Sequence, residues 1–278
     1  MAKKAANAET GFGKSLRDIV LIILLVLGIH SFVVKPFYIP SDSMMPLLHS
    51  GDRLIVSKYP YGWSYASISF HIAPPIAGRI AGKLPERGDV VVLEHPQLRV
   101  DYIKRVVGLP GDRLSMKDGV LSINGTPVRQ EIQPMRRIKV DANVPSAGSS
   151  LTRFVEKEAD GQLVLELPIV RETLPNGVSY DIIDMGRGYP NDDFDEITVP
   201  ANHLFLMGDN RDGSADSRVP TISKGLGGPV PFDAIAGRAE YITFSTDGSA
   251  SLWNPLSWWN ALREGRAGAS LRPQQKAN

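Results

Sequence analysis

The sequence predicts a mainly β fold, in which an antiparallel β-sheet domain carries an inserted smaller β-rich subdomain and follows one N-terminal transmembrane helix. Three observations support this. Residues 19–34 form an apolar run, short β-branched runs broken by Gly, Pro, Asp and Asn follow it, and residues 131–199 are richer in charge than their surroundings. A chain of 278 residues, 42% of them hydrophobic, is long enough to bury a sizeable core.

The apolar run at residues 19–34 contains no Asp, Glu, Lys or Arg. As a helix it covers roughly 24 Å, which is less than a ~30 Å hydrocarbon core unless Leu16 and residues 37–39 extend it. Basic residues precede the run, whereas only Lys35 follows it closely, so the positive-inside rule places residues 1–18 in the cytoplasm. A cleavable secretory signal has a similar layout, but no Ala-x-Ala-like site follows this run. We therefore expect a membrane anchor.

Turn signals organise the chain after the anchor. The pairs Asp118-Gly119 and Asn124-Gly125 flank residues 120–123 and predict two hairpin turns. Residues 59–85, rich in aromatic residues and then in Ala, Pro and Gly, predict an excursion between strands. The chain is expected to divide into a cytoplasmic tail (1–18), a transmembrane helix (19–34), a first core part (35–130, including the excursion 59–85), an inserted subdomain (131–199), a second core part (200–250) and a C-terminal tail (251–278).

The C-terminal tail begins with three tryptophans and ends in small and basic residues. The tryptophans are Trp253, Trp258 and Trp259. Such side chains either enter the membrane interface or pack in the core, and the sequence leaves both alternatives open. The part of the tail past Arg263 is expected to be mobile.

Composition excludes several functional classes. The 31 basic and 30 acidic residues leave a net charge of +1 without a basic stripe, which argues against nucleic-acid binding. The absence of Cys excludes thiol catalysis, disulfides and zinc–thiolate sites. The five histidines form neither an H-E-x-x-H motif nor a cluster, so we expect no metal and no cofactor.

Residues 38–46, YIPSDSMMP, contain the first segment of interest. Ser43 lies here among apolar neighbours, directly after the anchor. A serine hydroxyl is a weak nucleophile that needs a nearby base and hydrogen-bond donors for the oxyanion. Taken alone, this segment is best interpreted as a turn at the entry to a loop.

Residues 101–112, DYIKRVVGLPGD, contain the second segment. If Lys104 shares a strand face with Tyr102 and Val106, its ammonium is desolvated, and the amine then becomes available as a base near neutral pH. Taken alone, Lys104 is best explained as a lysine that points to solvent beside Arg105.

Residues 207–218, MGDNRDGSADSR, are the third segment and are dense in Asp, Ser, Asn and Arg. The spacing does not fit an EF-hand calcium loop, so a solvated loop is the simplest explanation of this segment alone. A Ser-His-Asp triad is not excluded by the number of histidines, but the chain lacks a G-x-S-x-G elbow and an S-x-x-K pair.

These three segments, together with RGDVVVL at residues 87–93 and in this order after one anchor, resemble the motifs of bacterial signal peptidase I (leader peptidase), a family of Ser-Lys dyad serine proteases. The motifs and their flanks cover somewhat under half of the chain, but their joint order is very specific. The resemblance implies a membrane-anchored serine endopeptidase that removes signal peptides from secreted precursor proteins. Together with the single apolar run and the positive-inside rule, it predicts a single-pass protein of the cytoplasmic (inner) membrane that works as a monomer, with its catalytic domain on the outer, periplasmic side.

The resemblance also implies roles for individual residues. Ser43 would attack the scissile carbonyl while Lys104 takes its proton, and Ser41 and the Ser43 amide would form the oxyanion hole. Ser214 would orient the Lys104 amine. Two further residues would support the third segment: Asp216 and Arg218. Six residues would line apolar pockets for small side chains at the first and third positions before the cleavage site: Phe37, Ile39, Pro40, Met44, Tyr102 and Ile103. Core packing is the alternative explanation for these six.

Two positions depart from the family pattern. Asp42 stands where glycine is common and would place a negative charge beside the nucleophile, and Gly213 stands where asparagine is common and would loosen the turn that aims Ser214. Many bacterial members also have two anchoring helices, whereas one is found here.

Two other functions remain open at this stage. A self-cleaving repressor-like Ser-Lys protease shares the fold by resemblance, but it would carry a DNA-binding head in place of the anchor. A non-enzymatic membrane-anchored β module would use the motif segments only as turns, and Ser43→Ala would then change nothing.

Overall fold

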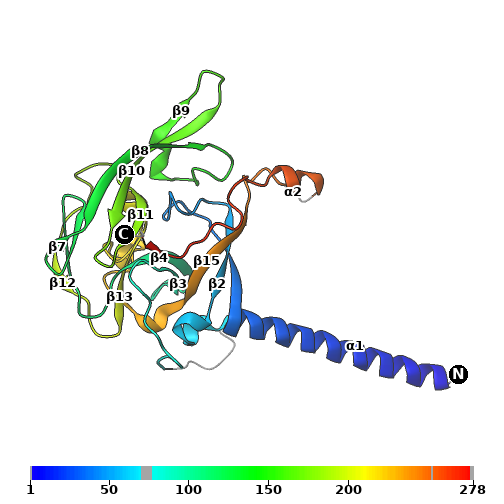
Figure 1. Ribbon diagram of the computed structural model, residues 1–278. Helices are drawn as coiled ribbons and strands as arrows, with labels where there is room; N and C mark the ends of the chain where they lie inside the picture. Colours follow the sequence, from blue (N-terminus) through cyan, green and yellow to red (C-terminus); the bar gives the residue numbers. More distant parts are fainter. Residues whose placement is uncertain (1, 70–76, 252, 276–278) are drawn as a thin grey trace.

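The computed structural model describes residues 2–69, 77–251 and 253–275. It confirms the predicted mainly β fold: one N-terminal helix precedes a domain built from three antiparallel sheets (Figure 1). The part of the predicted excursion at residues 70–76 lies outside the described residues.

The N-terminal helix α1 (Ala2–Gly28) continues as a π-helix (Ile29–Val33) and projects away from the β domain (Figure 1). The stretch Lys14–Val33 is long and apolar enough to cross a membrane. Most of its large apolar side chains are exposed, from 39% at Ile29 to 63% at Leu25. Water is a poor solvent for such a surface, so this exposure fits a helix surrounded by lipid.

The largest sheet has seven strands and begins directly after the π-helix. Its order is β1-β2-β15-β3-β4-β13-β14. The bounds are β1 Val34–Tyr38, β2 Asp52–Ser57, β3 Val90–Glu94, β4 Asp101–Gly108, β13 His203–Met207, β14 Val230–Pro231 and β15 Ile235–Ser245. Separate apolar clusters pack around its strands, one containing Leu54 and Val92 and another containing Val91 and Val106. This alternation along β3 is the period of two expected for a strand buried on both faces.

The other two sheets are formed mainly by the middle of the chain. The four-stranded sheet has the order β12-β5-β6-β7, with β5 Arg113–Lys117, β6 Val120–Ile123, β7 Thr126–Pro127 and β12 Phe194–Thr198. The other has the order β16-β11-β10-β8, with β9 paired to β10, and consists of β8 Arg129–Lys139, β9 Val155–Lys157, β10 Leu163–Thr173, β11 Val178–Ile183 and β16 Gln274–Gln275. The four-stranded sheet takes strands from both sides of residue 131, and the predicted domain division stays a prediction.

Both predicted hairpin turns are confirmed. Asp118 and Asn124 have φ angles of 50° and 54°, and the glycines that follow them have φ angles of 79°. Positive φ at both central positions is the geometry that Asp-Gly and Asn-Gly pairs favour in tight hairpins.

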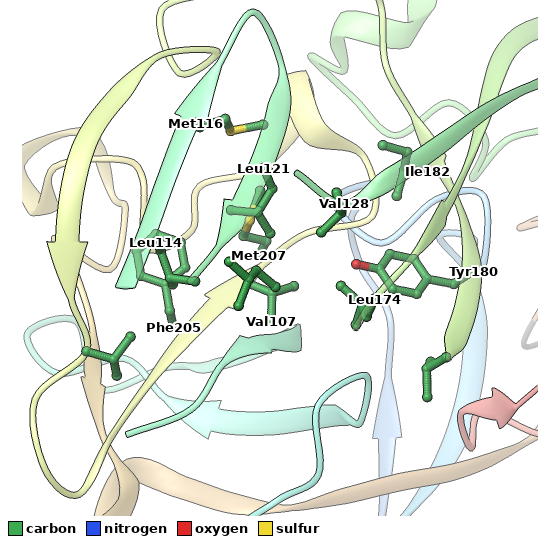
Figure 2. Close-up of a cluster of buried hydrophobic side chains, with 13 residues drawn as sticks. Val107, Leu114, Met116, Leu121, Val128, Leu174, Tyr180, Ile182, Phe205 and Met207 are labelled. Atoms are coloured by element: carbon green, nitrogen blue, oxygen red, sulfur yellow. The ribbon is translucent and has the colours of Figure 1, made fainter. Parts of the chain in front are cut away.

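A buried apolar cluster joins the sheets and supports the strands nearest the site. Figure 2 shows Val107, Phe205 and Met207 from the large sheet packed against Leu114 and neighbouring side chains of β5 and β6. The aromatic ring of Tyr180, from β11, enters the same cluster. β4 and β13 are therefore held from behind by the smaller sheets.

Short helices complete the fold. The 3-10 helices are Tyr59–Tyr61, Tyr65–Ser67, Ser150–Phe154, Arg211–Gly213, Thr221–Ser223 and Phe232–Ala234, and α2 is Leu256–Asn260. The tryptophans around α2 are exposed, Trp253 by 95%, Trp258 by 49% and Trp259 by 75%, so they are not core residues. Their contact with a membrane stays a prediction.

The expectation of a mobile tail past Arg263 is wrong for the described residues. The Arg266 guanidinium donates to the carboxylate of Asp52, Leu271 is 2% exposed, and β16 pairs with β11. The small residues of this stretch gave no sequence signal for the buried side chain of Leu271 or for two arginine contacts, which hold the stretch against the domain.

Candidate active site

Ser43 lies in a tight turn between β1 and β2. The amide of Met45 donates to the Asp42 carbonyl (3.0 Å), and the amide of Leu48 donates to the Met44 carbonyl (2.9 Å). The side chains of Met44, Met45 and Leu48 are fully buried, whereas Ser43 is half-buried. The apolar residues that follow Ser43 in sequence therefore hold the turn against the core and leave its hydroxyl accessible.

Lys104 reaches Ser43 from the middle of β4. Its Nζ donates to Ser43 Oγ (3.1 Å) and to the carbonyl of Ile103 (2.9 Å). The same Nζ lies 5.2 Å from the centroid of the Tyr102 ring, so Lys104 and Tyr102 lie close together as expected. The predicted nucleophile and base are thus brought into direct contact, across 61 positions of sequence.

Burial changes the chemistry of this amine, because Lys104 is only 3% exposed. Burial lowers the pKa of Lys104 to about 8, although the negative charges of Asp216 and Asp209 act in the opposite direction. An amine with a pKa near the working pH is present in part as the neutral form and is able to accept the proton of a serine hydroxyl.

The third segment follows β13 and is held by a buried ion pair. Arg218 donates to both oxygens of Asp216, from Nε (3.0 Å) and from Nη2 (2.8 Å), and the Gly208 amide donates to the same carboxylate (2.9 Å). Burial alone would favour the protonated acid, but the Arg218 charge and these hydrogen bonds hold the pKa of Asp216 below its ordinary value. The carboxylate of Asp216 therefore links the beginning of the segment, at Gly208, to its end, at Arg218.

Ser214 lies beside the Ser43 turn but does not contact Lys104 by a hydrogen bond. Its Oγ is buried and has no hydrogen-bond partner among the described residues, so the predicted bond to the Lys104 amine is not formed in this structure. The Lys104 bonds go instead to Ser43 and Ile103. A Cβ at Gly208 would lie 2.1 Å from Ser214 Oγ and 2.5 Å from the Ser43 carbonyl oxygen, which shows how closely these backbones approach.

A cleft of about 410 Å³ opens over Ser43 and Lys104. Its walls contain Ser41 and five of the predicted substrate-binding residues: Phe37, Ile39, Pro40, Tyr102 and Ile103. Four further lining residues were missed by sequence reasoning: Tyr38, Val92, Asp101 and Ala215. Val92 lies opposite Ile103 in the β3–β4 ladder, a pairing that depends on strand register and has no local signal in the sequence.

Met44 is the exception among the predicted substrate-binding residues. The structure places it outside the cleft, where it is 0% exposed and packs with Leu48 and Leu54. The turn sends the side chain of Ser43 toward the cleft and that of the next residue into the core. Met44 is therefore a core residue in this structure and does not line the cleft.

Asp42 points away from the cleft. Its Oδ2 accepts hydrogen bonds from the Ser146 amide (2.7 Å) and the Ser146 hydroxyl (2.9 Å), and its Oδ1 is buried without a partner. The carboxylate therefore joins the Ser43 turn to the loop that follows β8, and it is the backbone of Asp42 that lies beside the nucleophile.

Gly213 makes room for Asn210, a residue that sequence reasoning missed. A Cβ at Gly213 would lie 2.5 Å from Asn210 Nδ2. Asn210 holds the nucleophile turn, since its amide donates to the Ser43 carbonyl (3.1 Å) and its Nδ2 donates to the Asp42 carbonyl (3.2 Å). An asparagine following a Gly-Asp turn gives no sequence signal for such a role.

Buried ion pairs fasten the third segment to its neighbours. Arg105, next to Lys104, donates to both oxygens of Asp209 at 2.7 and 2.6 Å. Arg211 makes a two-pronged contact with Glu172 on β10. All four side chains are buried, so each charge depends on its partner.

A histidine does not replace Lys104 in the described part of the site. The rings of His95 and His203 contact the carbonyls of Gly225 and Ala201, each at 2.9 Å, and the His49 ring contacts Arg266 at 3.4 Å. His71 lies outside the described residues.

Comparisons with known proteins place the chain in a family. The family model described as signal peptidase, peptidase S26, matches residues 13–244. Signal peptidase I of Rickettsia massiliae is 33% identical over 265 residues, which cover 92% of this chain and 84% of the relative. Signal peptidase I of Rickettsia prowazekii is 31% identical over 271 residues, which cover 94% of this chain and 88% of the relative.

A crystal structure of a signal peptidase I from Enterococcus faecalis also matches, with 24% identity over 56% of this chain and 97% of that one. Its TM-score is 0.28, which is too low to support an argument about the fold. The sequence matches carry the assignment, because they extend over nearly the whole chain and include the segments of Ser43, Lys104 and Ser214. The chain belongs to the signal peptidase (peptidase S26) family.

Proposed function

We propose that this chain is a membrane-anchored serine endopeptidase that removes signal peptides from secreted precursor proteins, with Ser43 as nucleophile and Lys104 as general base. The observation that carries the proposal is the 3.1 Å approach of Lys104 Nζ to Ser43 Oγ at the base of a cleft. The relatives named above are signal peptidases I, which supports the choice of substrate.

The reaction begins when the neutral amine of Lys104 accepts the Ser43 proton while Oγ attacks the scissile carbonyl. The Ser43 amide and the Ser41 hydroxyl stabilise the oxyanion, and both residues line the cleft. Lys104 then gives its proton to the leaving amine, which releases the mature protein and leaves an acyl ester on Ser43. A water molecule, deprotonated by Lys104, hydrolyses this ester and restores the free serine.

The supporting residues act on position and charge. Asp216 and Arg218 hold the third segment, and Ser214 stands close enough to the Ser43 turn to orient the dyad in the substrate complex. The apolar side chains of Phe37, Ile39 and Ile103 line the cleft. An apolar cleft of this kind is the proposed binding site for the small side chains before the scissile bond that the family resemblance implies.

The membrane anchor determines where the proposed reaction takes place. We propose that α1 crosses the cytoplasmic membrane once, with the N-terminus in the cytoplasm and the β domain on the outer face, and that a monomer suffices for activity. The apolar segment of a precursor occupies the same bilayer, so tethering raises the effective concentration of substrate at the cleft. The repressor-like alternative is not favoured, because an apolar helix occupies the position of its DNA-binding head.

The decisive experiment measures cleavage of a precursor with an Ala-x-Ala site by the full chain in detergent micelles. Ser43→Ala and Lys104→Ala should each lower kcat/KM by at least about 10³-fold, because either change removes a group that acts in the chemical step. Ser115→Ala and Lys117→Ala are matched controls on β5, outside the cleft, and should leave the rate unchanged. Wild-type rates in both dyad variants would refute the mechanism and favour the non-enzymatic alternative. Hydrolysis of generic peptides without precursor cleavage would refute the substrate.

A further inference from the structure

A second concave site lies behind the catalytic strand. It has a volume of about 420 Å³ and is lined by residues of β4, β8, β10, β11 and the C-terminal stretch 270–274. Side chains alternate along a strand, so Lys104 faces the cleft and its neighbour Arg105 faces this second site. We call it the arginine pocket after four of its lining residues: Arg105, Arg136, Arg171 and Arg272.

The arginine pocket contains more positive than negative charge. Asp181 is its only carboxylate among the described residues, and it is shared by two guanidinium groups, Arg136 Nη2 at 2.5 Å and Arg171 Nε at 2.8 Å. Arg171 and Asp181 are direct partners in the β10–β11 ladder, so the sheet register holds this arrangement in place. Burial opposes the charge of Asp181, but its bonds to Arg171 and Arg136 hold the pKa of that carboxyl below its ordinary value.

The other wall of the pocket has a second positive charge in excess. Arg272 donates to Glu240 (2.6 Å), but the same carboxylate also accepts from Arg238 (3.0 Å). Arg105, in contrast, is balanced by Asp209. Two carboxylates are thus each shared by two arginines, so positive charge exceeds negative charge around the cavity, although Glu131 near Arg171 and Asp89 near Arg238 reduce the excess.

Hydrogen-bond donors remain available for a ligand. A guanidinium carries five N–H groups, whereas the side chains of Arg136, Arg171 and Arg272 each donate through one nitrogen in the part of the chain that the structure describes. These side chains are 40%, 38% and 57% exposed, so a molecule in solution reaches them. Forked N–H donors of this kind match the oxygens of a phosphate or carboxylate group.

We propose that the arginine pocket binds a small organic phosphate from the aqueous phase. Four arginines and one carboxylate line the cavity, and this excess of positive charge favours a phosphate monoester, which carries about −1.5 to −2 at neutral pH. The cavity exceeds a phosphate group in size, and Leu47, Leu271 and Pro273 provide apolar walls for the remainder of the molecule. Figure 1 shows β8, β10 and β11 on the side of the domain away from α1, which favours a soluble source over a lipid headgroup.

The test uses the full chain in phosphatidylcholine nanodiscs, titrated calorimetrically with glycerol 3-phosphate and with inorganic phosphate at constant ionic strength. Saturable binding is expected, tighter for the organic phosphate, and Arg136→Gln and Arg171→Gln should each weaken it by about tenfold, since each removes a charge-assisted hydrogen bond. Arg137→Gln is the matched control, because its side chain pairs with Glu166 and Glu158 outside the pocket. Absence of saturable binding, or equal affinity in all three variants, overturns the proposal.

A further variant guards against misfolding of the arginine variants. Gln274→Glu adds a negative charge at an exposed pocket residue and leaves the Arg–Asp181 contacts intact, so it should also weaken binding by about tenfold. Unchanged affinity in this variant counts against the proposal.

Nanodiscs that contain phosphatidylglycerol distinguish the two sources of phosphate. An unchanged dissociation constant is expected if the ligand comes from the aqueous phase. A tenfold rise would show that a lipid headgroup competes for the pocket, and the aqueous source would then be rejected.

Discussion

Lys104 Nζ lies 3.1 Å from Ser43 Oγ, and two consecutive residues of the third segment secure this contact from both sides. Asp209 binds Arg105, the neighbour of Lys104, while Asn210 donates its amide to the carbonyl of Ser43. The third segment thus holds the strand of the base and the turn of the nucleophile in one rigid arrangement. The third segment thereby fixes the distance between Lys104 Nζ and Ser43 Oγ, which a proton transfer between these two atoms requires.

Activity should rise with pH through the titration of Lys104. Burial lowers the pKa of Lys104 to about 8, and only the neutral amine accepts the serine proton. A plot of log kcat/KM against pH should therefore increase with a slope of one below about pH 8 and level off above it. Precursor cleavage measured from pH 5 to 10 in buffers of equal ionic strength checks this, and an acidic optimum would rule out Lys104 as the base.

Lys104→Met should abolish cleavage and stabilise the fold at neutral pH. The pKa of Lys104 is about 8 in the folded state, below the value of about 10.4 for an unfolded lysine. Between these two pH values the folded state therefore binds fewer protons than the unfolded state. Wild-type stability should accordingly rise between about pH 8 and 10, and the full cost of the buried charge is present below pH 8. Removing the amine should raise the free energy of unfolding at pH 7 by on the order of 2–3 kcal/mol.

Denaturation of the detergent-solubilised chain at pH 7 and pH 10 measures this effect. The gain from Lys104→Met should shrink at pH 10, where the amine of the folded wild type is largely neutral and no longer carries the cost of a buried charge. A variant less stable than wild type at pH 7 would contradict the expected cost of burial.

Asp42→Ala should loosen the loop after β8 without stopping catalysis. The change removes the acceptor of the Ser146 amide and hydroxyl bonds, which should cost about 1–3 kcal/mol of stability, while the carboxylate does not face the cleft. Hydrogen exchange at the Ser146 amide should become faster, and kcat/KM should stay within about threefold of wild type. Ser146→Ala is the control, since it removes the hydroxyl bond alone and should have a smaller effect; equal exchange rates in Asp42→Ala and wild type would refute the contact.

Gly208→Ala should impair catalysis through the positions of Ser214 and Ser43. The new Cβ would lie 2.1 Å from Ser214 Oγ and 2.5 Å from the Ser43 carbonyl oxygen, so both contacts must be relieved by a shift of these groups or of the Gly208 backbone. A displacement of this size should lower kcat/KM by about 10²-fold. Gly82→Ala is a matched control, because its Cβ meets only the Arg79 side chain at 3.4 Å or more, and it should cleave precursor at the wild-type rate.

The sequence was sufficient for features that have a local pattern. Short β-branched runs broken by turn residues indicated the strands, Asp118-Gly119 and Asn124-Gly125 indicated the hairpins, and the apolar run indicated the anchor helix. It was insufficient for features that depend on which distant strands meet. The Arg105–Asp209 pair joins residues 104 positions apart, and the Glu172–Arg211 pair joins β10 to the 3-10 helix of the third segment, so neither leaves a periodic signal.

The direction of individual side chains was the other limit. Ser43 and Met44 are neighbours in sequence, yet one faces the cleft and the other is in the core, because the turn geometry decides between them. The same holds for Ser214, whose hydroxyl lies beside the Ser43 turn without reaching the Lys104 amine.

The continuity between the π-helix and β1 has a consequence for substrate choice. The π-helix ends at Val33 and β1 begins at Val34, so no flexible linker separates the anchor from the strand that leads to the nucleophile. At ~3.3 Å per residue, the chain from Val34 to Ser43 spans at most about 30 Å. With the anchor embedded in the membrane, the hydroxyl of Ser43 is held within a limited height above the bilayer. The distance of a scissile bond from the membrane surface therefore decides whether it reaches the nucleophile. The enzyme should cut only precursors whose scissile bond emerges within that reach, however well their side chains fit the cleft.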